Sequence, residues 1–130
     1  MKKTVINPKG MCKPVGPYSH GVIAEGGRFL FIAGQVAWGP DGRIIGKGDF
    51  ETQARVVMQN IQRILEEAGG SFRNVVKIVN YLKNKDDYPF LKKVRSEFIK
   101  EDPPVSTLVQ IGNLLEDDLL IEVEAIAVLD

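Results

Sequence analysis

An alternating run near the end of the chain sets the strongest limit on its fold. From Leu119 to Leu129 every second residue is apolar, and these residues form one uninterrupted face of a strand: Leu119, Ile121, Val123, Ala125, Ala127 and Leu129. The opposite face is mixed, because Glu122 and Glu124 lie among apolar neighbours. A carboxylate in a half-buried strand is costly unless a partner pairs with it or a reaction uses it. Glu122 and Glu124 are therefore the first candidates for chemistry.

The composition limits the kinds of site and partner that the chain can have. Its 130 residues predict a single domain, residues 1–130, and 17 basic residues balance 17 acidic ones. We therefore expect no nucleic-acid or membrane partner. The single cysteine, Cys12, and the single histidine, His20, exclude an internal disulfide and a zinc site of the usual kind, so no metal is expected. The N-terminus lacks the apolar core of a signal peptide, which favours a cytoplasmic location.

Hydrophobic periodicity predicts six strands and two helices. Helical spacing of apolar residues extends from an N-cap at Asp49 to Gly69, and a second helix is expected from Tyr88 to Lys100, capped by Asp87. Val22–Ala24 and Arg28–Gln35 are expected to form a hairpin turned at Glu25-Gly26-Gly27. The other predicted strands are Thr4–Ile6, Val75–Leu82, Val105–Ile111 and Leu119–Leu129, which gives the order β-β-β-α-β-α-β-β.

Two helices can cover only one face of such a sheet. Phe29 to Ala33 is apolar on both faces, and Ile126 and Val128 add apolar side chains to the uncovered face. A second copy of the chain is the simplest cover. We therefore expect an oligomer in which Glu122 and Glu124 lie near subunit boundaries.

Three motifs resemble those of the Rid family, also called YjgF-like proteins, the reactive-intermediate imine and enamine deaminases. GPYSHG, residues 16–21, is similar to the family's GPYS signature, and FIAGQ, residues 31–35, resembles its central TSGQ strand. IEVEAIAV, residues 121–128, is close to its IEIEAIAV. The resemblance implies an α+β domain like chorismate mutase, with a mixed sheet and two helices on one face. It also implies a barrel-like homotrimer with sites between subunits, and cofactor-independent hydrolysis of 2-imino acids.

The resemblance also implies which residues would form the site. Gly34, Tyr18 and Glu122 match the family's central Gly, its Tyr and its Glu. The family's carboxylate-binding Arg, its thiol, the Ser before the Gly and its Asn are replaced by other residues here: Val105, Thr107, Ala33 and, near the Asn, Lys92.

The loss of the arginine changes the expected substrate. A shielded Arg–carboxylate pair contributes roughly 1.5–3 kcal/mol, and Val105 offers none of it. We expect Glu122 to protonate nitrogen and activate water, Thr107 to hold that water, and Gly34 N–H to contact the substrate. Neutral or weakly cationic imines and enamines are then preferred, unless Lys92 supplies the missing charge.

Other interpretations stay open at this stage. Glu122 is alternatively a structural acid bonded to backbone N–H groups or to a neighbouring lysine, and Tyr18 alternatively packs with its hydroxyl satisfied. The roles of Cys12 and His20 are not readable from the sequence. A non-catalytic small-molecule-binding or protein-protecting trimer is the alternative function. A ribonuclease or translation inhibitor is third, because the only basic cluster is expected to be solvated surface: Lys83, Lys85, Lys92, Lys93 and Arg95.

Overall fold

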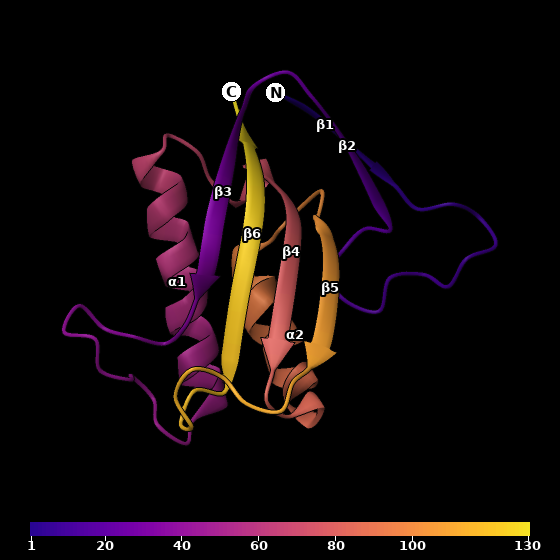
Figure 1. Ribbon diagram of the computed structural model, residues 1–130. Helices are drawn as coiled ribbons and strands as arrows, with labels where there is room; N and C mark the ends of the chain where they lie inside the picture. The colour runs from indigo at the N-terminus through magenta and orange to yellow at the C-terminus, as the bar shows by residue number, and fades with distance from the viewer.

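Six strands form two sheets in a computed structural model that describes residues 1–130 (Figure 1). A small antiparallel sheet pairs β1 (Lys2–Ile6) with β2 (Gly21–Glu25). The larger sheet follows the order β3 (Arg28–Gln35), β6 (Ile121–Leu129), β4 (Val75–Leu82) and β5 (Val105–Gln110). This sheet is mixed, because β4 and β5 are parallel while both pairs made by β6 are antiparallel.

Both helices cover the same face of the larger sheet, behind it in the view of Figure 1. They are α1 (Phe50–Glu67) and α2 (Tyr88–Phe98). Asp49 caps α1 by accepting a hydrogen bond from Thr52 N at 3.1 Å, as the sequence predicts. Two short 3₁₀ helices, η1 (Phe72–Asn74) and η2 (Lys85–Asp87), flank β4. The predicted element order, the α+β class and the one-sided helix layer are thereby confirmed.

The core lies between the helices and the alternating face of β6. Ile121, Val123, Ala125 and Ala127 are buried there, as their two-residue period predicts. They pack against the predicted apolar stripe of α1, whose buried members include Ala54, Val57, Met58, Ile61 and Leu65. The period of two in the strand and the helical spacing in α1 therefore meet in one core.

The opposite face of the sheet is uncovered in the single chain. Phe29 and Phe31 on this face are 70% and 72% exposed, and their rings stack with centroids 6.1 Å apart. The register places Phe31 beside Ile126, so the apolar surface continues from β3 onto β6. We refer to this surface as the open face. Neither helix reaches it (Figure 1).

Two local predictions were wrong. β2 and β3 do not form a hairpin, because β2 pairs only with β1, whereas β3 pairs with β6. Gly26 and Gly27 both have positive φ, 71° and 96°, and they turn the chain from one sheet into the other instead of closing a two-stranded turn. Asp87 precedes α2 but its side chain makes no capping hydrogen bond. The 3₁₀ helix η2, capped by Asn84, leads directly into α2. Neither helix has the length and hydropathy to cross a membrane.

Candidate functional site

A β-bulge near the end of β3 brings the backbone of Gly34 against the carboxyl group of Glu122. The pairing register between β3 and β6 shifts between Ile32 and Gln35, so β3 carries one extra residue. A Cβ added to Gly34 would lie 1.9 Å from Glu122 Oε2 and 2.8 Å from its Cδ. Glycine is therefore required at position 34 for this close approach, and the carboxyl group lies at the bulge.

A cleft of about 260 Å³ opens beside this contact on the open face. Its walls come from β3, β4, β6 and the loop after β5: Gly34, Tyr81, Ile111, Leu114, Glu122 and Glu124. Two bonds fix the loop. Ile111 N donates to Leu82 O at 2.9 Å, and the Lys83 ammonium group donates to the carbonyl oxygen of Asp117. The cleft thus has an apolar loop side and an acidic sheet side.

The two acids of β6 are in different hydrogen-bonding states. The phenol of Tyr81 donates to Glu124 Oε1 at 2.5 Å. This bond raises the pKa of Tyr81, and burial and the negative charges of Glu124 and Glu122 act in the same direction. Glu122 has no hydrogen-bond or ion-pair partner within the chain, and no lysine or arginine lines the cleft. Glu122 is therefore the free acid of the cleft, and Glu124 is the bonded one.

The remaining predicted site residues on the sheet lie at its other edge. Val105 and Thr107 are on β5, and Thr107 pairs with Val79, which in turn pairs with Glu124. Thr107 is thus two strands from Glu124, a separation of about 10 Å at the usual strand spacing. Tyr18 lies beyond β5, because the adjacent Ser19 forms a β-bridge with Val105. One chain therefore does not bring Tyr18, Val105 or Thr107 into the cleft that contains Glu122.

Two other predicted contacts are placed apart from the cleft. Ala33 lies in the bulge with its carbonyl oxygen accepting from Gln35 Nε2 at 3.1 Å, and it does not line the cleft. Lys92 is exposed on α2, where its methylene groups would lie 3.7 Å from a Cβ at Gly16. Lys92 is thus on the helix side of the sheet and does not supply a cation to the cleft of its own chain.

The loop that carries Tyr18 also contains the only histidine and the only cysteine. His20 Nε2 is 2.6 Å from the carbonyl oxygen of Cys12, and the Tyr18 and His20 rings meet edge to face with centroids 5.9 Å apart. Cys12 is exposed and free. No group of three or more His, Cys, Asp or Glu side chains has the arrangement of a metal site.

Arg95 is the main feature of this region that the sequence interpretation placed wrongly. Expected on solvated surface, it is 2% exposed, because it lies on the inner side of α2. Its guanidinium donates to Ser106 Oγ and to Pro17 O, each at 3.0 Å, and burial lowers its pKa to about 10. No carboxylate pairs with it, and its Nε has no partner. Arg95 thus ties the loop of Tyr18 to the strand of Thr107.

Sequence reasoning also missed Tyr81 and the apolar loop side of the cleft. A signal for Tyr81 was available, since it alternates with Lys77 and Val79 on the strand face opposite the core. Its position across from Glu122 depends on the strand register, which the sequence alone does not reveal.

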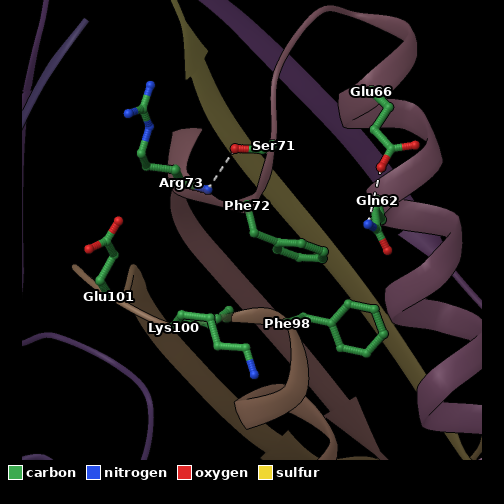
Figure 2. A pocket seen from close by; sticks show the side chains of 9 residues that line it. Gln62, Glu66, Ser71, Phe72, Arg73, Phe98, Lys100 and Glu101 are labelled. Carbon is green, nitrogen blue, oxygen red and sulfur yellow. Dashed lines mark hydrogen bonds between the residues drawn. The ribbon is translucent and has the colours of Figure 1, made fainter.

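A second depression, of about 350 Å³, lies on the helix side of the sheet, away from the open face. Phe72 and Phe98 line it with ring centroids 5.5 Å apart (Figure 2). Its rim carries charges of both signs, from Glu66, Arg73, Lys100 and Glu101. None of the predicted site residues lines it, so the cleft on the open face is the better candidate site.

The fold and the cleft on its open face define a small α+β protein with an acidic site beside a glycine bulge. The model of the family described as Endoribonuclease L-PSP matches residues 9–129. The chain therefore belongs to this family, the YjgF/RutC/Rid family.

Similar proteins from several organisms share nearly the whole length of the chain. A RutC family protein of Pyrococcus abyssi is 42% identical over 127 residues, which cover 98% of each chain. A RutC family protein of Synechocystis is 37% identical over 89% of this chain and 88% of that one. The crystal structure of the Rid family protein YyfB from Yersinia pestis superposes with a TM-score of 0.91 at 32% identity, over 99% of this chain and 100% of that one. RidA from an Antarctic Psychrobacter has a TM-score of 0.73 at 29% identity, over 97% and 99%.

Proposed function

We propose that the protein is a hydrolytic deaminase of small reactive imines and enamines that carry no carboxylate group. The observation that carries this proposal is the Glu122 carboxyl group, which lies against Gly34, has no partner within the chain, and faces a cleft with no cation. A free carboxylate beside a small cleft is suited to moving protons to and from a bound molecule. Glu124, bonded to Tyr81, has a supporting role.

Glu122 alone can carry the proton transfers that hydrolysis of a C=N bond needs. It accepts a proton from water as the water oxygen bonds to the imine carbon, while the π electrons of the C=N bond move to nitrogen. Glu122 then gives that proton to nitrogen. Glu122 then takes the hydroxyl proton as that oxygen forms a carbonyl, and it gives this proton to the nitrogen, so that the C–N bond breaks and ammonia leaves. The net change is imine plus water to carbonyl compound plus ammonia.

The charge of the cleft decides which imines fit. A substrate carboxylate would approach Glu122 and Glu124 with no compensating arginine or lysine in the cleft. Two like charges about 4 Å apart repel by roughly 1 kcal/mol in water, and by about 4 kcal/mol at an effective dielectric constant of about 20. Val105 stands where the family has its carboxylate-binding Arg. Neutral and cationic imines avoid this repulsion.

We further propose that the working form is a homotrimer whose sites lie between subunits. The exposed Phe29 and Phe31 give the open face an apolar surface that a second copy would bury. Contact between the open face of one subunit and the β5 edge of another would bring Tyr18 and Thr107 to the cleft of the neighbour. Thr107 would then hold the attacking water, as the family resemblance implies.

Ammonia release tests the deaminase function directly. An amino-acid oxidase generates 2-iminobutyrate in situ, and a flavin-dependent amine oxidase generates an imine without a carboxylate. Purified protein is expected to accelerate ammonia release from the second imine more than from the first. Glu122→Gln is expected to abolish the acceleration, whereas Glu67→Gln, at an exposed unpaired acid of α1, is expected to leave it unchanged. Faster turnover of 2-iminobutyrate would contradict the substrate choice, and no acceleration of either imine would refute the deaminase.

Mixing two inactive variants tests whether the site is shared between subunits. Thr107→Ala and Glu122→Gln are each expected to be inactive, or nearly so. Unfolding them together in equal amounts and refolding them allows random assembly. A site is intact when its Glu122 comes from a Thr107→Ala chain and its Thr107 comes from a Glu122→Gln chain. About one quarter of the sites then recover if the interface is shared in this way. A mixture no more active than its components would show that Glu122 and Thr107 do not act across an interface.

A binding or protein-protecting trimer is the alternative within the same fold. It retains the cleft and the apolar open face but does not need the free acid of Glu122. Such a protein would bind a small ligand in Glu122→Gln as in the wild type, and neither would release ammonia.

The description of the family model as an endoribonuclease favours a third function, cleavage of RNA. The balance of 17 basic and 17 acidic residues weighs against it, and so does the absence of lysine and arginine from the cleft. Binding to a labelled single-stranded RNA, measured between about 50 and 200 mM salt, distinguishes an RNA-cleaving protein from a deaminase of small imines. Affinity that falls steeply with salt would support RNA as a ligand.

A further inference from the structure

Tyr81 lines the cleft, and a hydrogen bond to Glu124 holds its hydroxyl group. The register pairs it with Glu122 on β6, while its hydroxyl reaches Glu124 Oε1, two residues further along the same strand. Side chains of directly opposed residues lie about 5 Å apart. The phenol oxygen is therefore bonded to one acid of β6, and the free acid Glu122 lines the same cleft.

The bond to Glu124 determines what Tyr81 can offer to a ligand. A phenol has a single proton, and here that proton is donated to Glu124. Toward the cleft the Tyr81 oxygen can then only accept. Glu122, an unpartnered carboxylate, also accepts. The side chains on the sheet side of the cleft thus present acceptors and no donor.

We infer that Tyr81 is a specificity-determining residue that accepts an N–H hydrogen bond, so that the cleft selects planar nitrogen cations of the iminium class. A protonated primary imine has two N–H bonds in one plane. One can be directed to Glu122 and the other to Tyr81. This inference deepens the proposed function and rests on the same cleft being used for compounds with a C=N bond.

The same arrangement separates substrate from product. The carbonyl product has an oxygen acceptor in place of the N–H donors of the imine. It therefore gains no hydrogen bond from Tyr81 or from an ionised Glu122. The cleft therefore favours the imine over its carbonyl product.

Binding of stable cations tests the inference without relying on turnover. Acetamidinium is planar and carries N–H donors, whereas tetramethylammonium has the same charge and no N–H bond. Isothermal titration calorimetry is expected to show tighter binding of acetamidinium to the wild type. Tyr81→Phe is expected to weaken acetamidinium binding by about tenfold, the effect of losing one hydrogen bond to a charged group, and to leave tetramethylammonium unaffected.

Two further variants separate the hydrogen bond from charge and from folding. Glu124→Gln removes a charge but retains an oxygen that accepts from Tyr81, so both cations should weaken alike and their affinity ratio should persist. Tyr88→Phe removes a phenol on α2, on the helix side of the sheet, and should change neither affinity. If Tyr81→Phe does not fold, the ratio in Glu124→Gln decides the question, since a collapsed ratio would overturn the inference.

The outcomes distinguish this inference from the deaminase proposal. Equal binding of both cations to the wild type, or unchanged acetamidinium binding in Tyr81→Phe, would overturn the role of Tyr81 even in an active deaminase. Selective acetamidinium binding through Tyr81, in a protein that releases no ammonia, would refute the deaminase and leave the nitrogen-cation site standing.

Discussion

Replacing Gly34 with alanine should separate the activity of the cleft from the stability of the fold. The new Cβ would lie 1.9 Å from Glu122 Oε2, 2.8 Å from its Cδ and 3.0 Å from its Cγ. The Glu122 side chain must therefore rotate away from the bulge. Gly34 is not among the glycines with positive φ, so alanine meets no backbone strain there.

The expected change in the free energy of unfolding is much smaller than the expected change in the activation barrier. Moving Glu122 to another rotamer costs about 0.5–1.5 kcal/mol if the new position is imperfect. The loss of chain entropy in the unfolded state on replacing Gly34 with alanine offsets about 0.4–1 kcal/mol of this cost. The free energy of unfolding should thus change by less than about 1 kcal/mol. Removing a general acid–base from its position lowers the rate by about 100- to 10,000-fold, or about 3–5 kcal/mol in the barrier.

Thermal unfolding by circular dichroism and ammonia release from a carboxylate-free imine measure the two effects in parallel. Gly112→Ala is the matched control, because an added Cβ there has no heavy atom within 4 Å. We expect Gly34→Ala to unfold within about 5 °C of the wild type and to lose nearly all turnover. A folded Gly34→Ala variant with wild-type turnover would refute the idea that Glu122 acts from its position on the bulge.

Three further outcomes follow from the burial and contacts of single residues. The pKa of Tyr81 is raised above its ordinary value of 10.0, so the bond to Glu124 contributes its full stability below pH 10. This contribution is lost as the pH rises through the pKa of Tyr81 in the folded protein. Urea unfolding at alkaline pH should therefore show a smaller loss of stability in Tyr81→Phe than in the wild type. Arg95→Met leaves the carbonyl of Pro17 without its donor and should lower the free energy of unfolding by about 1–3 kcal/mol, and an equal or higher value would contradict a structural role for the bond. Phe31→Ser on the open face should lower the fraction of oligomer measured by sedimentation velocity. An unchanged fraction of oligomer in the variant, or a monomeric wild type, would contradict burial of that face.

Much of the fold was predictable because the main elements follow simple periods. The period of two in residues 119–129 identified β6 and its buried face, and the Asp49 cap and the apolar stripe identified α1. The hairpin of β2 and β3 was predicted wrongly for a physical reason. Two successive glycines allow a tight turn and also a change of sheet, and only the pairing of β3 with β6 decides between them.

The candidate site was predictable only in part. The cost of burying a carboxylate identified Glu122, and the motif around Gly34 placed the glycine beside it. Tyr81 was missed because its contact depends on the register between β4 and β6. Arg95 was missed although it follows Tyr88 and Leu91 at helical spacing, which places it on the inner side of α2. A charged residue on an apolar stripe indicates a buried polar contact, as the acids of β6 do.

The buried guanidinium of Arg95 explains how the second half of the proposed site is held. It donates to the carbonyl of Pro17, immediately before Tyr18, and to the hydroxyl of Ser106, immediately before Thr107. Burial of this charge without a carboxylate partner is costly, and the two hydrogen bonds that it donates offset that cost. The rigid, planar donors of an arginine also fix the separation of the two segments that they bind. If Tyr18 and Thr107 complete the cleft of a neighbouring subunit, Arg95 sets their spacing from behind the strand.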